Sequence, residues 1–436
     1  KSLKLDFNAN NLAVVGETPG RVKPKEHDEY QLWKDSVITS LKSWGEVTRY
    51  DHTVALTYTV PLDKLPLTDW ITANAGYTAG YQWDRAPFTQ DTLGHVVQNS
   101  RNISLNGQFN FVSLYNKSKW LKKINDKAKG RPAKQTTPAR GAAPKPEKEE
   151  EEKDKDKPKF NVLENLARLL MGVRTASLTY SQTNGTLLPG YGRKTNIVGM
   201  DNFGAPGIGF VLGQQNEDIN GEPVRDFATT AAANGWLVRN ESIFNPYTST
   251  RNENITARMS LEPFKGMRIE LNANRTMATS KRSFFRWNED LGSYVNDSPN
   301  ENGSFSVSML TLRTAFVNDD GNAANAVFKE LLQNRRVISG RIGAENPESA
   351  LDPNTGYFTG YGPTNQDVAI PAFIAAYTGQ SADKVKTNPF KQAPLPNWDI
   401  TYDGLTKMEP FSKWFRTFTL KNSYRSNFSV ASFQTN

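Results

Sequence analysis

Strict alternation of apolar and polar residues is the sequence feature that most limits the folds open to this chain. From Ile71 to Trp83, every second residue is Ile, Ala, Tyr or Trp, and the residues between them are Thr, Asn, Gly and Gln. A period of two places these two sets on opposite faces of a β-strand. The same pattern covers residues 53–60, 102–111, 255–262 and 267–274, with shorter runs at 176–180, 208–212, 305–309, 398–402 and 418–430. The sequence therefore predicts an antiparallel all-β protein.

Helical spacing is confined to a few short stretches. Apolar residues recur every three or four positions from Tyr30 to Trp44, just before Gly45, and this spacing predicts a helix that stops there. Residues 162–170 and 327–332 predict two further short helices.

The longest apolar run is Ile370–Tyr377. It is far shorter than the roughly 18 to 20 residues that a membrane-spanning helix needs, so the chain is not a helical membrane protein. The run is apolar on all sides, which predicts a buried segment with Pro371 near a helix start or a kink. We expect Ile370, Phe373 and Tyr377 to be buried in an insertion or to contact a partner protein.

Most of the positive charge lies in one segment. The chain carries a formal net charge of +8, and the stretch Lys117–Lys159 holds fifteen Lys and Arg against eight Asp and Glu, a surplus of +7. Residues Lys127–Lys159 include no aromatic or β-branched apolar residue, so they cannot bury enough surface to offset the cost of ordering. We expect a disordered, solvated loop. The acidic run Glu149–Glu152 and the lack of aromatics argue against a nucleic-acid-binding tail.

The residues that catalysis or metal binding would require are missing. The chain has no Cys, which excludes thiolate nucleophiles and Cys-ligated metals, and His27, His52 and His95 do not form a ligand motif. Gly190–Thr195 lacks the spacing of a phosphate-binding loop, and Gly207–Phe210 alternates like a strand instead of opening a nucleotide-binding helix. We therefore predict no catalytic, cofactor-binding or metal site, and no enzymatic activity.

Alternation alone fits two architectures. In a soluble β-sandwich two apolar faces pack together, whereas in a transmembrane barrel the apolar face meets lipid and the polar face lines a lumen. The run Ile71–Trp83 favours the barrel, because it is long enough to cross a bilayer obliquely and its apolar face ends in aromatics typical of the headgroup level. Its polar face of Asn, Thr, Gly and Gln also suits a wet lumen. We predict an antiparallel transmembrane β-barrel, with the sandwich as the alternative.

The same alternation assigns residues to the two faces of the predicted barrel. The residues expected to face lipid are Tyr58, Tyr77, Tyr81, Ile103, Phe109, Ile255, Met259, Ile269 and Leu271. Those expected to face the lumen are Thr57, Asn74, Asn106, Arg258 and Asn272.

These patterns divide the chain into five stretches. They are an N-terminal segment with a short helix and barrel strands (1–116), a charged disordered loop (117–160), barrel strands and loops (161–317), a helical or irregular insertion (318–396) and final barrel strands (397–436). Both ends of the chain look cut, so we expect it to be a piece of a longer protein.

Several short strings carry a family resemblance, in the same order over nearly the whole chain. They are Pro61–Trp70, Leu114–Asn116, Lys123–Asn125, Met171–Arg174, Leu178–Tyr180, Ala205–Phe210, Ile370–Tyr377 and Pro396–Trp398. These strings resemble the SprA/Sov family, the giant outer-membrane translocon of the Bacteroidetes type IX secretion system. The strings are structural, and they bring no catalytic residue with them.

The resemblance implies a passive outer-membrane channel that exports folded proteins and is linked to gliding motility where the organism glides. It places the protein in the outer membrane of a Gram-negative Bacteroidetes bacterium. Because the family proteins are several times longer, the chain would form only a section of a very large barrel. The implied partners are a PorV-type outer-membrane barrel protein, a periplasmic plug protein, secreted cargo proteins and the lipid bilayer, without nucleic acid or cofactor.

Two other functions fit the residues. A nutrient-uptake outer-membrane receptor is also a barrel, but it would show an N-terminal plug domain and an energy-coupling box, and neither is visible in these residues. A soluble glycan-binding β-protein would use exposed loop aromatics to stack on sugars. The candidates for that stacking are Trp236, Tyr247, Tyr357 and Tyr361.

Overall fold

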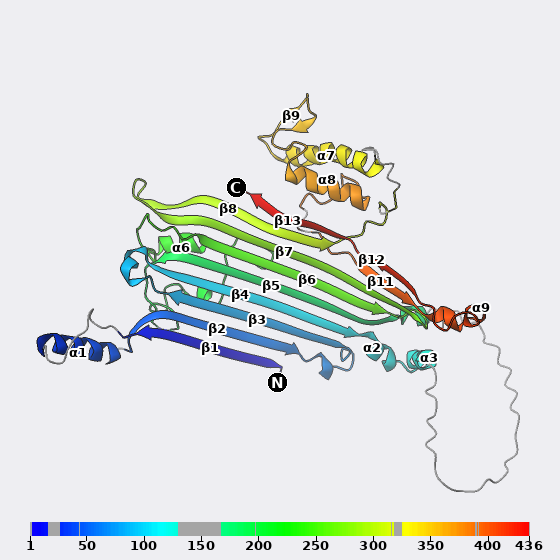
Figure 1. Ribbon diagram of the computed structural model, residues 1–436, viewed down its shortest axis with the longest axis horizontal. Helices are drawn as coiled ribbons and strands as arrows, with labels where there is room; N and C mark the ends of the chain where they lie inside the picture. The colour runs from blue at the N-terminus through cyan, green and yellow to red at the C-terminus, as the bar shows by residue number, and fades with distance from the viewer. Residues whose placement is uncertain are drawn as a thin grey trace, which may run out of the picture.

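The computed structural model describes residues 2–15, 27–42, 44–129, 167–196, 198–314, 316–317, 325–388, 390 and 392–435. Within these residues one large antiparallel sheet dominates (Figure 1). Its strands are β1 (Leu3–Val14), β2 (Glu46–Val60), β3 (Ile71–Asp84), β4 (His95–Asn110), β5 (Val173–Tyr191), β6 (Tyr247–Leu261), β7 (Met267–Asn288), β8 (Ser293–Ser308), β11 (Asn397–Tyr402), β12 (Leu420–Tyr424) and β13 (Asn427–Thr435). The predicted antiparallel all-β class is confirmed.

The helices connect or flank these strands. They are α1 (His27–Lys42), α2 (Phe111–Lys117), α3 (Lys119–Lys129), α5 (Ile208–Val211), α6 (Phe227–Ala233), α7 (Ala326–Glu345), α8 (Gln366–Thr378) and α9 (Glu409–Ser412), with short 3-10 turns η1 (Leu62–Lys64), η2 (Phe88–Leu93) and η4 (Gly404–Lys407). A small hairpin of β9 (Leu351–Asp352) and β10 (Tyr357–Phe358) lies between α7 and α8 in the chain.

Neighbouring strands pair in sequence order from β1 to β7, and the sheet is open. The edge at one side is β1, and the strands at the other side are β12 and β13. Residues that pair across strands lie on the same face, so Leu56, Tyr77 and Ile103 form one apolar row across β2, β3 and β4. That further strands close this sheet into a barrel stays a prediction.

Strand β7 pairs with two partners along its outer edge. Residues 275–288 pair with β8, and residues 267–272 pair with β11. The Leu395 N–H donates to the Ser308 carbonyl at 2.9 Å, and Ser308 Oγ donates to the Leu395 carbonyl at 2.7 Å. Strands β8 and β11 therefore lie end to end along the same edge of β7, and residues 309–396 are inserted between them.

The interrupting residues form a helical subdomain with its own core. Helices α7 and α8 begin at Asn325 and Asn365, whose side chains accept the N–H groups of Val327 and Asp367. The buried members of the core are Met309, Val327, Leu331, Ile338, Val368, Ala372, Ile374, Ala375, Ala376, Ala382 and Val385. This insertion lies beside the edge of the sheet formed by β8 and β13 (Figure 1).

Three residues of α8 were expected to be buried in an insertion or in a partner contact. Ile370, Phe373 and Tyr377 are half-buried and pack against the subdomain core. Phe373 stacks on Tyr377 with ring centroids 4.2 Å apart and lies 5.8 Å from the ring of Phe428 on β13. Phe373 thus joins the insertion to the sheet.

The structure differs from the sequence expectations at three elements. The predicted strand at 208–212 was wrong: Ile208–Val211 form helix α5, because this short apolar run turns back onto the sheet. The alternation at 267–274 is only the first part of β7. The strand continues to Asn288, although charged residues such as Arg275 and Lys281 occupy positions that the alternation would make apolar. Strand β1 was not predicted, although it pairs with β2 over its whole length.

The first part of the predicted disordered loop is helical. Residues 119–129 form helix α3, and Ile124 is buried beside Ala167 and Met171. The remainder of the predicted loop, residues 130–159, lies outside the described residues. The N-terminal helix predicted from Tyr30 to Trp44 is α1, which ends at Lys42. No helix in the described part of the chain is long and apolar enough to cross a membrane.

Candidate functional site: a two-faced sheet and its cover

One face of the sheet is polar along its whole length, and we call it the polar face. Asn74 of β3 pairs with Asn106 of β4, which in turn pairs with Thr179 of β5. Thr179 pairs with Thr256 of β6 on the same face. Most positions of this face carry Asn, Thr, Ser, Gln or Gly, whose side chains hydrogen-bond to water at low cost.

The opposite face carries an apolar band at the end of the strands nearest α2 and α9. On β3 to β7 and β11, the band consists of Ile71, Ala73, Ala75, Tyr77, Ile103, Leu105, Gly107, Phe109, Ala176, Leu178, Tyr180, Ile255, Ala257, Met259, Leu261, Met267, Ile269, Leu271, Ala273, Trp398, Ile400 and Tyr402. None of these side chains is charged. Leu105 and Leu178 in the middle of the band are each 47% exposed.

Aromatic rings gather at the outer end of the band. Trp70 lies 6.1 Å from Phe109, and Phe264 lies 5.8 Å from Tyr402, both measured between ring centroids. We call this the aromatic end of the band and the other the cover end. Rings at such a boundary can place an apolar body in a nonpolar phase and a polar edge in water.

The strand register separates the two predicted sets of residues. All nine candidates for lipid contact lie on the face that carries the apolar band, and all five candidates for the lumen lie on the polar face. Contact with lipid or with a lumen itself stays a prediction. The expectation that Tyr81 faces lipid was wrong, because this residue is only 2% exposed and its hydroxyl donates to the Gly199 carbonyl at 2.9 Å. Tyr77 lies at the margin, and its hydroxyl donates to the Leu212 carbonyl at 2.5 Å.

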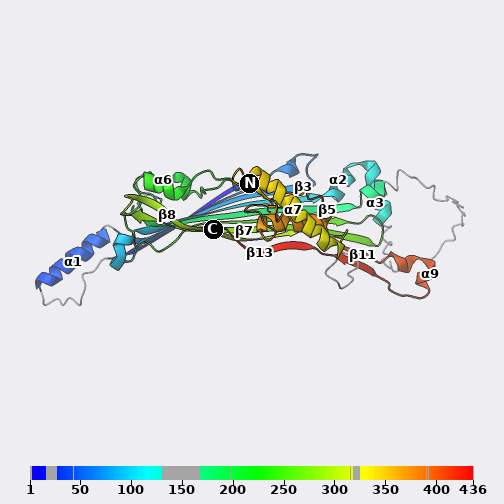
Figure 2. The same cartoon turned by 90° about the horizontal axis from the view of Figure 1, so that it is seen from above.

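Beyond the cover end of the band, other parts of the chain cover this face of the central strands. The connection from β5 to β6, residues 192–246 without residue 197, lies across the strands at the end away from α9, and we call it the cover segment (Figures 1 and 2). Its Phe210 and Phe227 stack with centroids 3.7 Å apart and pack with Tyr81, Trp83 and Leu188 of the sheet. The cover segment thus shares a hydrophobic core with the sheet.

Buried amides also hold the cover segment in place. Asn99 of β4 donates through Nδ2 to the carbonyls of Phe210 and Gln214, each at 2.8 Å. Gln215 donates to Asn99 Oδ1 at 3.0 Å and accepts from Thr186 at 2.9 Å. These buried polar groups hydrogen-bond to one another, so they both position the cover segment on the sheet and stabilise it there.

A charged cluster lies beneath the cover segment. Arg251 of β6 is 6% exposed, pairs with Glu253 at 2.9 Å and donates to the carbonyls of Asp218 and Ile219. Glu253 also pairs with Arg275 of β7. These charges stand on the same face as the apolar band, directly beyond its cover end, where Ile255 gives way to Glu253.

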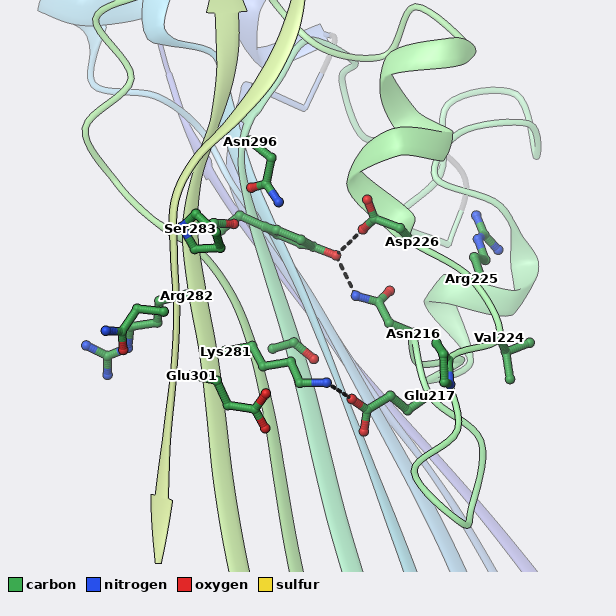
Figure 3. Close-up of a pocket in the computed structure, with 15 residues that line it drawn as sticks. Asn216, Glu217, Val224, Arg225, Asp226, Lys281, Arg282, Ser283, Asn296 and Glu301 are labelled. Carbon is green, nitrogen blue, oxygen red and sulfur yellow. Dashed lines mark hydrogen bonds and ion pairs between the residues drawn. The ribbon is translucent and has the colours of Figure 1, made fainter. Parts of the chain in front are cut away.

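A cavity of about 680 Å³ opens between the cover segment and strands β6 to β8 (Figure 3). Tyr247 lines it, donates its hydroxyl to Asp226 at 2.9 Å and accepts from Asn216 at 2.5 Å. Lys281 pairs with Glu217 at 2.5 Å across the same space. These hydrogen bonds and this ion pair link the cover segment to the sheet across the cavity.

One carboxylate of the cover segment closes a turn in the exposed loop beside this cavity. Asp218 Oδ1 accepts the backbone N–H groups of Glu222 at 2.9 Å and Asn220 at 2.7 Å. The N–H of Glu222, followed by that of Asn220, lowers the pKa of Asp218. The turn therefore favours the ionised carboxylate.

The charged cluster was missed by the sequence reasoning, although a signal was present. On β6 and β7 the apolar positions of the alternation change to charged residues at Glu253 and Arg275. That change marks where the exposed face ends and the covered face begins. The sequence reasoning took this change for the end of each strand and so did not predict that both strands continue past it.

The loop aromatics proposed for sugar stacking are not exposed. Tyr247 is buried in β6, and Trp236, Tyr357 and Tyr361 are half-buried. Among the described residues no group of three or more His, Cys, Asp or Glu is placed to bind a metal ion. No family model matches this chain, and no curated protein matches it in sequence.

Proposed function

We propose that this chain is a section of the wall of an outer-membrane β-barrel, and that the whole protein is a passive channel through which folded proteins are exported. The observation that carries the proposal is the sheet itself, with one continuous polar face and, on the other, an uncharged, partly exposed apolar band. In a soluble sandwich a second sheet would cover this band. In the described residues the other sheet is only the β9–β10 hairpin of the helical subdomain.

The polar face fits the lining of a wide aqueous channel. Amide and hydroxyl side chains such as Asn74, Asn106 and Thr179 wet readily and bind passing protein surfaces weakly. A wide lumen of this kind has no means of closing by itself. Closure would come from separate proteins, in agreement with the plug and the PorV-type barrel implied by the resemblance to the SprA/Sov family.

The open edges of the sheet support a wall that continues into further strands. Among the described residues no strand pairs with the outer edge of β1 (Leu3–Val14), and Leu5 and Phe7 on it are exposed. Exposed edges of this length pair readily with another strand. In a barrel the next strand of the wall would pair with β1, and the edge would disappear.

Deletion of the gene in the source organism tests this function. We expect secreted cargo proteins to remain in the cell, and a plasmid copy to restore their export. Normal secretion together with the loss of uptake of one nutrient would instead support a receptor barrel. Extraction from cells without detergent would contradict both barrel functions and support a soluble protein.

A further inference from the structure

The apolar band of the strands is too short to match a bilayer by itself. It runs from Ile103 to Phe109 on β4 and from Met267 to Ala273 on β7, seven residues on each strand. Seven residues span about 20 Å along a strand, which gives about 14 Å of height at the usual tilt of barrel strands. The lipid-facing band of an outer-membrane barrel is about 25 Å tall. A wall built on this sheet therefore needs about 10 Å more apolar height than its strands supply.

Charged residues interrupt the apolar surface at the cover end of the band. Arg101 on β4, Glu253 on β6 and Arg275 on β7 directly follow the band on its own face. The cover segment lies across this part of the strands (Figures 1 and 2). Charged side chains are costly inside hydrocarbon, so the missing height does not lie in this direction.

At the aromatic end, a series of rings instead carries the apolar surface from the strands into the connections. Phe109 of the band lies 6.4 Å from Phe111 of α2, and Phe111 lies 6.4 Å from Tyr115, measured between ring centroids. Trp70, in the connection before β3, lies 5.2 Å from Phe111. The Tyr115 hydroxyl donates to the Leu170 carbonyl at 3.3 Å, just before β5. These connections are therefore continuous with the band.

Four connections meet the strands at the aromatic end, and together we call them the collar (Figure 1). They are residues 61–70, residues 111–129 with 167–172, residues 262–266 and residues 403–419. Their exposed large apolar side chains are Leu65, Leu67, Trp120, Leu169, Leu170, Phe264, Met408, Trp414 and Phe415. Leu67 is 81% exposed and Trp414 is 83% exposed. Exposed apolar side chains gathered in this way mark a contact surface.

The backbone of the collar suits the edge of a bilayer, because short helical turns make up much of it. In η1 the Leu65 N–H donates to the Leu62 carbonyl at 3.2 Å. After α9 the Phe415 N–H donates to the Phe411 carbonyl at 2.9 Å. Backbone groups that bond within their own segment do not need water, which a nonpolar phase cannot supply.

The collar is also strongly basic. Its four connections hold twelve Lys and Arg against six Asp and Glu, a surplus of +6. On α3, the side chains of Lys119, Lys122 and Lys123 are exposed, as is the ring of Trp120, whereas Ile124 is buried. A helix of this kind, with exposed cations beside an exposed indole, is attracted to anionic lipid headgroups.

We infer that the collar lies in the headgroup–acyl boundary of one leaflet, where its apolar side chains complete the height of the band and its Lys and Arg side chains bind phosphates of anionic phospholipids. This inference rests on the proposed barrel wall. Amphipathic segments at this boundary sink by about 5 to 10 Å, which matches the height that the strands lack. A protein partner over the same side chains would leave the short band unexplained.

Fluorescent labelling of the full-length protein in lipid vesicles tests the position of the collar. This chain contains no Cys, and any Cys elsewhere in the protein is replaced by Ser, so each variant carries one nitrobenzoxadiazole label. Leu67→Cys and Leu170→Cys label the collar, and Leu105→Cys labels the middle of the band. Phe244→Cys is the matched control, because Phe244 is a comparably exposed apolar residue of the cover segment. Lipids brominated at different depths report contact with acyl chains, and acrylamide reports contact with water.

The collar labels should lose fluorescence to bromines near the headgroups, the label at position 105 to bromines in mid-chain, and the label at position 244 to acrylamide alone. Collar labels quenched by acrylamide and not by bromines would overturn the inference, and bromine quenching at position 105 would then leave the wall standing. Collar labels protected from both reagents would assign the collar to a protein contact and overturn the inference equally. The absence of bromine quenching at position 105 would contradict the wall itself.

The binding of phosphates is tested through the charge of α3. Lys119→Gln, Lys122→Gln and Lys123→Gln are combined in one variant that carries the label at position 170. A rising share of phosphatidylglycerol in phosphatidylcholine vesicles should increase bromine quenching of this label in the parent and not in the variant. Lys34→Gln, at an exposed lysine of α1 at the other end of the strands, is the matched control. An equal increase in the parent and the triple variant would contradict phosphate binding by α3.

Discussion

Tyr247 of β6 donates its hydroxyl hydrogen to Asp226 Oδ1, 2.9 Å away, and so ties the sheet to the start of α6 in the cover segment. The same carboxylate accepts the N–H groups of Ala228 and Thr229, which begin that helix. A single hydroxyl therefore links the packing of the sheet to the fold of the segment that covers it.

Tyr247→Phe should loosen the cover segment while the barrel wall stays assembled. The ring can keep its contact with Phe285, 6.3 Å away, but the hydrogen bond to the Asp226 carboxylate is lost, at a cost of about 1.5 to 3 kcal/mol. Hydrogen exchange should accelerate in residues 227–233 and not in β4. Tyr58→Phe, at an exposed tyrosine 38% accessible to solvent, is the control. Unchanged exchange in α6 would show that the hydroxyl contributes nothing to docking.

Phe373→Asp should detach the helical subdomain from the sheet. The change removes ring contacts to Tyr377 and Phe428 and places a charge in a half-buried apolar site. We expect a loss of about 2 to 4 kcal/mol in the stability of the subdomain, measured by hydrogen exchange of α7 and α8. Phe328→Asp, at a residue 39% exposed on α7, should cost far less. Equal losses in the two variants would contradict a role of Phe373 in docking.

Met259→Arg should destabilise the assembled protein by about 2 to 4 kcal/mol, because it places a charge near the middle of the apolar band. Thr256→Arg, on the polar face of the same strand, should have little effect. Reversible urea unfolding in vesicles measures both changes. If the Thr256 variant were the less stable, the assignment of faces to lipid and lumen would be inverted.

Replacement of residues 130–159 by a short Gly/Ser linker should leave assembly intact. The composition of these residues supplies no core, and the cost of closing a loop changes slowly with its length. The amount of folded protein in the outer membrane is the measurement. Its loss after the replacement would show that this segment takes part in folding or docking.

The turn at Asp218 should open at acidic pH. Its folded pKa lies below the ordinary value, so its contribution to stability is present above the unfolded pKa and is lost as the pH falls through the lowered folded pKa. Hydrogen exchange at Asn220 and Glu222, corrected for intrinsic rates, should rise in that range. Asp218→Asn should abolish the pH dependence, and its persistence in that variant would assign it to another group.

The assignment of residues to two faces was accessible from the sequence. Alternation in Ile71–Trp83 placed Tyr77 and Asn74 on opposite sides because a pleated strand turns every second side chain the same way. This is a local property of the backbone, and it needs no knowledge of distant residues. The burial of much of α8 followed similarly from the apolar run Ile370–Tyr377 within it.

Only the tertiary structure decided which part of the apolar face is exposed. Tyr58 and Tyr81 occupy equivalent positions in the alternation, yet Tyr58 is 38% exposed and Tyr81 is 2% exposed. The difference comes from Gly199 and the cover segment, which reach Tyr81 from 118 residues away. The joining of β8 to β11 across the helical insertion likewise depends on Ser308 and Leu395, 87 residues apart. Periodicity records the geometry of one strand, whereas burial depends on which distant segment packs against it, and no local pattern encodes that choice.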